Sequence, residues 1–388
     1  MVKILISAGD LSGERYAADL VRALARKRPD ARFFGLGGAA MAEQGVELVV
    51  DQRDLAVGGI VEAAGSIGRL VSAWRRMQRA VRDESPDLAI LVDSGGFNLP
   101  FARRLRRSNA CPVFYYVAPQ AWAWREERVH ALAERANRIA VILPFESAFY
   151  AKHGIEVDYV GHPLLDRSTG DGSAPRPADR RAARLRLGLP SDGPMLGLYP
   201  GSRRSELKYH LPLFLDAFER LLAERPGVRA AIARAPTLAR GAIESAIEQR
   251  SELLRESTDV VSGDSVDLSL AVDVAITKPG TTTLELMLSG CPMVVAGRVH
   301  PWTARFVRRS IKVEFVAMPN LIFEERVVPE CLQEAATPEA VSEAAAALFE
   351  GPAREAQQRV FSQARSRLGS PGASERAASI AEELLGTA

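Results

Sequence analysis

The feature that most constrains the fold of this chain is the stretch Leu196-Gly-Leu-Tyr-Pro-Gly-Ser-Arg-Arg-Ser-Glu206. An apolar run from Met195 to Tyr199 predicts a buried strand, and Pro200-Gly201-Ser202 breaks it before a polar, helix-forming segment. Such a turn leaves backbone N–H groups unpaired at the positive end of a helix, where an anion fits. Arg203 and Arg204 follow, and a guanidinium can clamp an anion with two N–H donors. The stretch predicts either a diphosphate site or an ordinary strand-to-helix turn with solvated arginines.

Similar apolar strands recur along the chain and alternate with amphipathic helices, which is the pattern of doubly wound α/β domains. The predicted strands cover residues 2–8, 32–34, 86–92, 112–117, 138–143, 157–160, 195–199, 229–233, 259–261, 274–277, 293–296 and 313–316. The stretch from Asp166 to Ala182 is rich in Gly, Pro, Ser and charge, lacks apolar periodicity and predicts a linker.

A chain of 388 residues is long for a single core, so we expect two α/β domains in tandem with a cleft between them. We place the first domain at residues 1–166 and the second at residues 183–365. Residues 366–388 are expected to form a C-terminal helix that packs back across the domains.

The composition excludes several classes of protein. A net charge of +2 argues against a nucleic-acid binder that relies on bulk charge. The cysteines Cys111, Cys291 and Cys331 are far apart and form no CxxC pair, which indicates a reducing compartment. The N-terminus does not have the pattern of a signal peptide, and no apolar run is long enough to span a membrane. We therefore expect a cytoplasmic protein that can still touch a membrane surface.

In the first half, the leading catalytic candidate is Asp93, at the tip of the predicted strand 86–92. Open α/β sheets bind ligands at the carboxyl ends of their strands, and a carboxylate there can take a proton from a hydroxyl. The alternative is an Asp that caps the next turn. Trp122 and Trp124 either line a cleft or fill the core, and His162 either acts on a substrate or is structural.

In the second half, the strand 274–277 ends in Lys278-Pro-Gly, and three threonines open a helix. This predicts a second anion-binding turn, with hydroxyl groups for sugar or phosphate. Glu285 can accept both hydroxyls of a ribose, or it can simply complement the helix dipole. No His, Cys or Asp cluster has metal-ligand spacing, so we predict no metal and no cofactor.

The predicted helix from Glu62 to Arg82 combines an apolar stripe with five arginines. Such a helix suits a membrane interface with anionic lipid, but the pattern alone favours a core helix with a solvated basic face, because most amphipathic helices cover a core. The apolar candidates for membrane contact are Val61, Ile67, Leu70, Val71 and Trp74.

Short motifs along nearly the whole chain resemble the lipid-A-disaccharide synthase family. They are Ser12-Gly13, Leu55-Ala-Val-Gly-Gly-Ile-Val-Glu62, Asp93 with Phe97-Asn98, Trp122-Ala-Trp-Arg125, Leu143-Pro-Phe-Glu146, Gly161-His162, Pro200-Gly-Ser-Arg203, Gly280-Thr281 with Leu284-Glu285, Cys291-Pro-Met-Val-Val295 and Pro319-Asn-Leu321. Each motif is short, and their order and spacing together are specific.

The resemblance implies a GT-B glycosyltransferase with two Rossmann-like domains. Members join UDP-2,3-diacylglucosamine to 2,3-diacylglucosamine 1-phosphate with inversion, forming a β-1,6 linkage and releasing UDP. The implied partners are these two lipids and the inner face of the inner membrane, without nucleic acid, and a homodimer stays open. The alternatives are another GT-B enzyme, such as a UDP-GlcNAc 2-epimerase or a transferase to a different lipid, and an inactive nucleotide-sugar-binding relative.

The resemblance also implies roles for single residues. Asp93 is the essential carboxylate and candidate base, Arg203 holds the diphosphate, and the Val61–Val71 segment faces the membrane. On the UDP side we place Gly201, Ser202, Arg203, Gly280, Thr281, Thr282, Glu285 and Asn320. On the acceptor side we place Asp10, Ser12, Gly13 and Asn98.

The chain departs from the family pattern at several positions in or beside these motifs, and Ala63 and Ala64 weaken the apolar surface of the membrane-facing segment. Asp10 stands where the family has Glu, and Glu14 stands where it has Asp. Gly96 stands where the family has a second Asp. Because Asp93 itself is present, the assignment of the base is unaffected.

Overall fold

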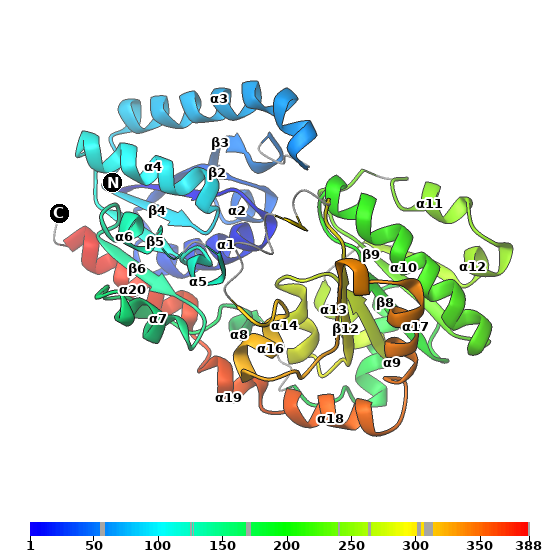
Figure 1. Ribbon diagram of the computed structural model, residues 1–388. Helices are drawn as coiled ribbons and strands as arrows, with labels where there is room; N and C mark the ends of the chain where they lie inside the picture. Colours follow the sequence, from blue (N-terminus) through cyan, green and yellow to red (C-terminus); the bar gives the residue numbers. More distant parts are fainter. Residues whose placement is uncertain are drawn as a thin grey trace. The chain divides into compact units, whose positions relative to one another are not determined.

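The computed structural model describes residues 1–54, 59–124, 126, 128–167, 172–239, 241–262, 265–300, 304–305 and 313–386, with the backbone alone at 59–67, 124 and 265. The chain forms two compact units (Figure 1). The first unit is Met1–Arg167 together with Leu368–Ala388, and the second is Ser168–Arg367.

The first unit is built on a sheet of seven parallel strands in the order β3-β2-β1-β4-β5-β6-β7. The strands are β1 (Lys3–Ala8), β2 (Arg32–Gly37), β3 (Glu47–Asp51), β4 (Leu88–Val92), β5 (Val113–Tyr116), β6 (Arg138–Val141) and β7 (Asp158–Tyr159). The α-helices are α1 (Leu11–Lys27), α2 (Ala39–Glu43), α3 (Gly59–Glu84), α4 (Gly95–Ser108), α5 (Ala121–Trp124), α6 (Arg128–Ala133), α7 (Glu146–Lys152), α8 (Leu164–Arg167) and α20 (Ala373–Gly386).

The second unit contains six parallel strands in the order β10-β9-β8-β11-β12-β13. The strands are β8 (Met195–Tyr199), β9 (Arg229–Arg234), β10 (Thr258–Ser262), β11 (Val274–Thr277), β12 (Met293–Gly297) and β13 (Glu330–Leu332). The described α-helices are α9 (Pro177–Arg186), α10 (Arg204–Glu224), α11 (Glu244–Glu248), α12 (Glu252–Glu256), α13 (Ser265–Ala271), α14 (Thr282–Leu288), α16 (Met318–Phe323), α17 (Pro338–Ala346), α18 (Pro352–Phe361) and α19 (Ala364–Leu368).

The central strands are apolar because helices cover both faces of each sheet. Every residue of β4 and of β8 is buried, which explains their continuous apolar runs. In the first sheet, the strands that follow β1 extend toward one edge, and the strands that follow β4 extend toward the other. In the second sheet, β8 and β11 are the corresponding pair of neighbours. These two places are the topological switch points at which open α/β sheets bind ligands.

Two of the edge strands differ from the sequence prediction. The strand β3 was not predicted, because its short edge segment is only partly buried and its apolar signal is weak. The predicted strand at 313–316 is wrong, since β13 holds the edge position beside β12. The reason is that the Glu330 carboxylate accepts the Val316 and Ala317 amides at 3.0 and 2.8 Å, so these N–H groups need no neighbouring strand.

The C-terminal helix α20 belongs to the first unit, where the chain also begins. The Asp166 carboxylate accepts the amides of Gly372, Ala373 and Ser374 at 2.5, 3.2 and 3.0 Å. Such acceptors satisfy the orphan N–H groups of a helix start. Ion pairs from α1, such as Lys27 to Glu382 at 3.1 Å, hold the far end of α20.

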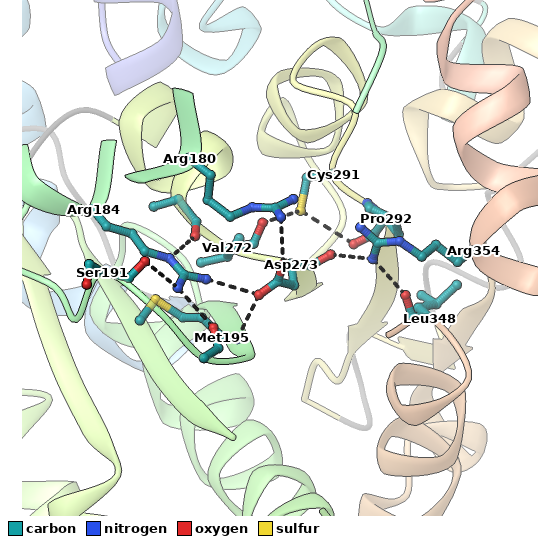
Figure 2. Close-up of polar contacts among 12 residues, drawn as sticks. Arg180, Arg184, Ser191, Met195, Val272, Asp273, Cys291, Pro292, Leu348 and Arg354 are labelled. Atoms are coloured by element: carbon teal, nitrogen blue, oxygen red, sulfur yellow. Dashed lines mark hydrogen bonds and ion pairs between the residues drawn. The ribbon is translucent and has the colours of Figure 1, made fainter. Parts of the chain in front are cut away.

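A partly buried ionic cluster lies at the amino ends of β8 and β11 in the second sheet (Figure 2). The Asp273 carboxylate pairs with Arg180 and Arg184, each at 3.0 Å, and accepts the Met195 amide at 2.9 Å. Arg354 donates to the Asp273 carbonyl at 2.9 Å. Burial raises the pKa of the neighbouring Cys291 thiol to about 12, so this cysteine is protonated and unreactive. The cluster therefore fastens α9 and α18 to the sheet.

We predict that Asp273→Asn lowers the free energy of unfolding by about 3 kcal/mol, because it leaves the buried Arg184 guanidinium without its counter-ion. Urea unfolding of the full chain measures the change. The control is Asp179→Asn on α9, the helix that carries Arg184; it removes only an exposed pair with Arg176 and should leave stability unchanged. Equal stabilities for the two variants would contradict the assignment.

His162 lies in the core of the first unit, with 1% of its surface exposed. Its Nδ1 accepts the Leu164 amide at 3.2 Å, its ring meets Tyr16 edge to face, and its Nε2 has no hydrogen-bond partner among the described residues. Burial lowers the pKa of His162 to about 3, so the ring is neutral. The structural alternative for this histidine is therefore the correct one.

We predict that His162 makes the first unit sensitive to acid. The pKa of His162 is lower in the folded protein than in the unfolded chain, so the unfolded chain takes up a proton at a higher pH. The free energy of unfolding therefore decreases as the pH falls below about 6.5. His162→Asn keeps an acceptor for the Leu164 amide and cannot titrate. The wild type should lose about 2 kcal/mol more than this variant between pH 6.5 and pH 5 in urea titrations. Parallel stability curves would refute the prediction.

Candidate active site

The first group of site residues lies at the switch point of the first sheet, where β1 and β4 end side by side. Ser94 links the two loops, because its hydroxyl accepts the Gly9 amide at 2.9 Å and donates to Asp10 Oδ2 at 2.8 Å. Asp10 Oδ1 in turn accepts the Gly13 amide at 2.8 Å and so caps α1. The loop that contains Asp93 therefore lies against the segment with the predicted acceptor residues Asp10, Ser12 and Gly13.

Asp93 occupies a strained position at this corner. Asp93 and Ser94 have φ angles of 44° and 46°, a left-handed conformation that costs energy for residues other than glycine. The Asp93 carbonyl accepts the Tyr115 hydroxyl at 2.6 Å and Asn98 Nδ2 at 3.1 Å, which holds the strained backbone. A Cβ on Gly13 would lie 3.5 Å from Asp93 Cβ, so the two loops approach closely. The half-buried Asp93 thus has a backbone held by hydrogen bonds, and it stands at the edge where open α/β sheets bind ligands.

Asn98, predicted on the acceptor side, is buried beneath this edge and supports its backbone. It is fully buried, and its Nδ2 donates to the carbonyls of Ser7, Val92 and Asp93 at 3.1, 2.9 and 3.1 Å. Its Oδ1 accepts the Ser7 hydroxyl at 2.7 Å. The side chain is used entirely in joining the ends of β1 and β4.

The two acidic departures from the family pattern have separate structural uses. Asp10 is the cap described above, whereas Glu14 is buried and accepts the Ala40 amide at 2.8 Å and Gln52 Nε2 at 2.6 Å. A Cβ on Gly96 would meet nothing within 4 Å, so the missing second Asp leaves open space.

Of the two tryptophans, Trp122 fills the core. It is buried, meets Phe145 edge to face and donates from Nε1 to Glu146 Oε1 at 3.0 Å. The Glu146 carboxylate also accepts the Ile142 and Leu143 amides at 3.0 and 2.8 Å. The side chain of Trp124 lies outside the described residues.

The second group lies at the switch point of the second sheet, in the loop between β8 and α10. Gly201 has φ 121°, and a Cβ there would lie 2.4 Å from Glu206 Oε2, so only glycine fits. Glu206 Oε2 accepts the Ser202 amide at 2.8 Å and the Arg203 amide at 3.3 Å. The loop amides that the sequence predicts for an anion therefore already face a carboxylate. The side chain of Arg203 is exposed.

The neighbouring loop, between β11 and α14, carries the other predicted donor residues. Gly280 has φ 150°, Thr281 directly precedes α14, and Thr282 and Glu285 lie within it. Thr281, Thr282 and Glu285 are all half-buried. Lys278, at the start of this loop, pairs with Glu206 at 3.2 Å. Neither Lys278 nor Glu206 has a predicted role of its own, because their pairing depends on two strands meeting in the sheet.

Asn320, predicted on the nucleotide side, uses its side chain in hydrogen bonds within the second unit. It is fully buried in α16, donates to the Val328 carbonyl at 3.0 Å and to Glu330 Oε1 at 2.9 Å, and accepts the Val328 amide at 2.8 Å. Asn320 instead fixes the segment that leads into β13.

The predicted helix is confirmed as α3, and its apolar side chains differ in exposure. Leu70 and Val71 are 42% and 39% exposed, and the nearby Arg69, Arg75 and Arg76 are exposed as well. Trp74 packs inward on Phe97 and Phe101 at ring distances of 5.5 Å, so it contacts the core. The side chains of Val61 and Ile67 lie outside the described residues.

Within the described part of the chain, no group of three or more His, Cys, Asp or Glu side chains could hold a metal ion. Likewise, none of the helices found there has both the length and the apolar character needed to cross a bilayer.

Comparisons with known proteins agree on the family and the fold. The family model of lipid-A-disaccharide synthetase matches residues 4–384. A lipid-A-disaccharide synthase of Myxococcus xanthus is 41% identical over 384 residues, covering 99% of this chain and 97% of that protein.

Among solved structures, the S. aureus MnaA–UDP co-structure has a TM-score of 0.67 at 14% identity, covering 100% of this chain and 98% of that chain. A UDP-N-acetylglucosamine 2-epimerase structure from Listeria monocytogenes has a TM-score of 0.65 at 13% identity, covering 97% and 94%. At such identities the likeness concerns the fold alone, which is the GT-B class of two Rossmann-like α/β units. Because the family model spans nearly the whole chain and the M. xanthus relative is 41% identical over almost all of it, the chain belongs to the lipid-A-disaccharide synthase family.

Proposed function

We propose that this hexosyltransferase joins UDP-2,3-diacylglucosamine to 2,3-diacylglucosamine 1-phosphate, giving the β-1,6 disaccharide 1-phosphate and UDP. The observation that carries the proposal is the family match over residues 4–384, together with the position of Asp93, whose backbone is strained, at a switch point. The direct test is incubation with both lipids and mass spectrometry of the lipid product.

In this proposal Asp93 is the base that takes the proton from the acceptor 6-hydroxyl. A single displacement inverts the sugar and needs no nucleophile on the protein, so one carboxylate suffices. The fixed backbone at Asp93 supports this role, because a base must stand within hydrogen-bond reach of the hydroxyl. Asp10, Ser12 and Gly13 would then border the acceptor in the first unit.

The second unit would bind the UDP moiety. The leaving diphosphate gains negative charge as the glycosidic bond breaks, and groups of fixed positive charge stabilise it. We assign this task to Arg203 with the loop residues Gly201, Ser202, Gly280, Thr281 and Thr282, and assign the ribose to Glu285. The MnaA structure, solved with UDP, supports a nucleotide site in this fold.

Both proposed substrates carry acyl chains, so the enzyme must reach a membrane surface. We propose that Leu70 and Val71 enter the lipid while the neighbouring arginines meet anionic headgroups at the inner face of the inner membrane.

A second candidate function is a UDP-GlcNAc 2-epimerase, which the L. monocytogenes neighbour favours at the level of the fold. An epimerase converts UDP-GlcNAc without any acyl chain. Turnover of UDP-GlcNAc alone, with no product from the two lipids, would favour this candidate.

We predict that Asp93→Asn lowers kcat at least 100-fold, because the amide has the shape of the carboxylate and cannot take the proton. Affinity for UDP should be unchanged. Steady-state kinetics with both lipids and calorimetry with UDP measure the two effects. The control Asp30→Asn alters an exposed acid of the same unit and should keep full activity. Normal turnover by Asp93→Asn would show that another group is the base.

We predict that the double variant Leu70→Glu, Val71→Glu binds vesicles containing phosphatidylglycerol about tenfold more weakly, because it replaces apolar contacts by like charge. Vesicle co-sedimentation measures the binding. The matched control is Leu185→Glu, Leu253→Glu, which alters two side chains of the second unit that are 82% and 58% exposed. Equal losses in both double variants would argue against a membrane role for α3.

A further inference from the structure

Hydrogen bonds from two other segments of the second unit hold the loop between β8 and α10. The Thr237 hydroxyl donates to the Ser202 carbonyl at 2.6 Å, and His210 Nδ1 lies 3.0 Å from the Pro200 carbonyl oxygen. With Gly201 in its left-handed conformation, the backbone of this loop is held on several sides. A ligand arriving here would therefore meet a preformed set of amides.

A carboxylate of the protein itself occupies these amides. Glu206 Oε2 accepts the Ser202 and Arg203 N–H groups, and Glu206 Oε1 pairs with the Lys278 ammonium at 3.2 Å. Amides at a helix start together with an ammonium are the contacts that a phosphate group takes. Although burial opposes the shift, the pKa of Glu206 is lowered, because Lys278 and the Ser202 amide favour its charged form.

Lys278 reaches this position through the pairing of β8 with β11. Thr277 stands in register with Tyr199, and the Lys278 amide donates to the Tyr199 carbonyl at 3.3 Å. The ammonium also lies 3.1 Å from the Pro279 carbonyl oxygen and 3.1 Å from the place of a Cβ on Gly280. The Lys278 ammonium thus lies close to both predicted donor loops. The Lys278 side chain is 23% exposed, whereas the Arg203 side chain is exposed to solvent.

We propose that Glu206 is a resident anion that the donor diphosphate replaces, and that Lys278 then turns from Glu206 to the diphosphate as a further donor-binding residue. This rests on the proposed function, since it requires a donor with a diphosphate. Without a ligand, Glu206 satisfies the amides and the ammonium, which would otherwise be partly desolvated and unpaired. The exchange of one anion for another keeps the site preformed and eases the release of UDP.

The test compares the binding of UDP and of uridine by calorimetry in four full-length proteins: the wild type, Glu206→Gln, the double variant Glu206→Gln, Lys278→Met, and the control Lys208→Met. Glu206→Gln removes the competing charge and should bind UDP about threefold to tenfold more tightly. The double variant should bind UDP at least tenfold more weakly than Glu206→Gln, because a charged hydrogen bond is lost. Uridine affinity should be the same in all four, and Lys208→Met, an exposed change on α10, should match the wild type.

Several outcomes would overturn the exchange. Equal UDP affinity in Glu206→Gln and the double variant would show that Lys278 does not touch the diphosphate. Weaker UDP binding by Glu206→Gln would show that Glu206 is a structural support.

Should Lys278→Met disturb the fold, seen as a loss of uridine binding, Lys278→Gln in the same background gives the same comparison. If the wild type binds neither UDP nor uridine, the proposed function is itself wrong and the exchange falls with it, whereas normal UDP binding with unchanged variants removes the exchange alone.

Discussion

The parallel pairing of β1 with β4, and of β8 with β11, is the constraint on which both candidate sites depend. In each sheet these two strands are neighbours, and the chain continues from them toward opposite edges of the sheet. The loops that follow the two strands therefore lie side by side, and their backbone groups are not used in hydrogen bonds between strands. Residues far apart in the chain meet there. Ser94 reaches Asp10 in one unit, and Lys278 reaches Glu206 in the other.

The two corners are stabilised in different ways. At Asp93 the backbone is strained, and Asn98 and Tyr115 hold it through hydrogen bonds to carbonyl oxygens. At Ser202 the strain falls on Gly201, which tolerates it, and a charged side chain closes the loop. The first arrangement suits a base that must stay in place. The second suits a site whose charged ligand arrives and leaves.

Buried polar side chains away from the ligand edges do much of the joining. Asn98 ties two strand ends, Asn320 fixes the approach to β13, and Asp273 gathers arginines at the opposite end of the second sheet. All three satisfy backbone or charged groups that would otherwise be buried and unpaired. A short motif that contains such a residue looks the same whether the residue binds a substrate or holds the fold.

The sequence by itself determined the fold class, the family and most of the strands. The buried strands β8 and β11 have the predicted bounds, because a continuous apolar run between turn residues leaves little choice. It also determined Asp93 as the candidate base, since a carboxylate directly after such a strand must lie at the ligand edge. Only the tertiary structure decided that Asn98 and Asn320 are buried supports, that Trp74 faces the core, and that Glu206 fills the amides of its own loop. These facts depend on which distant groups a side chain meets, and periodicity along one chain carries no information about contacts between its strands.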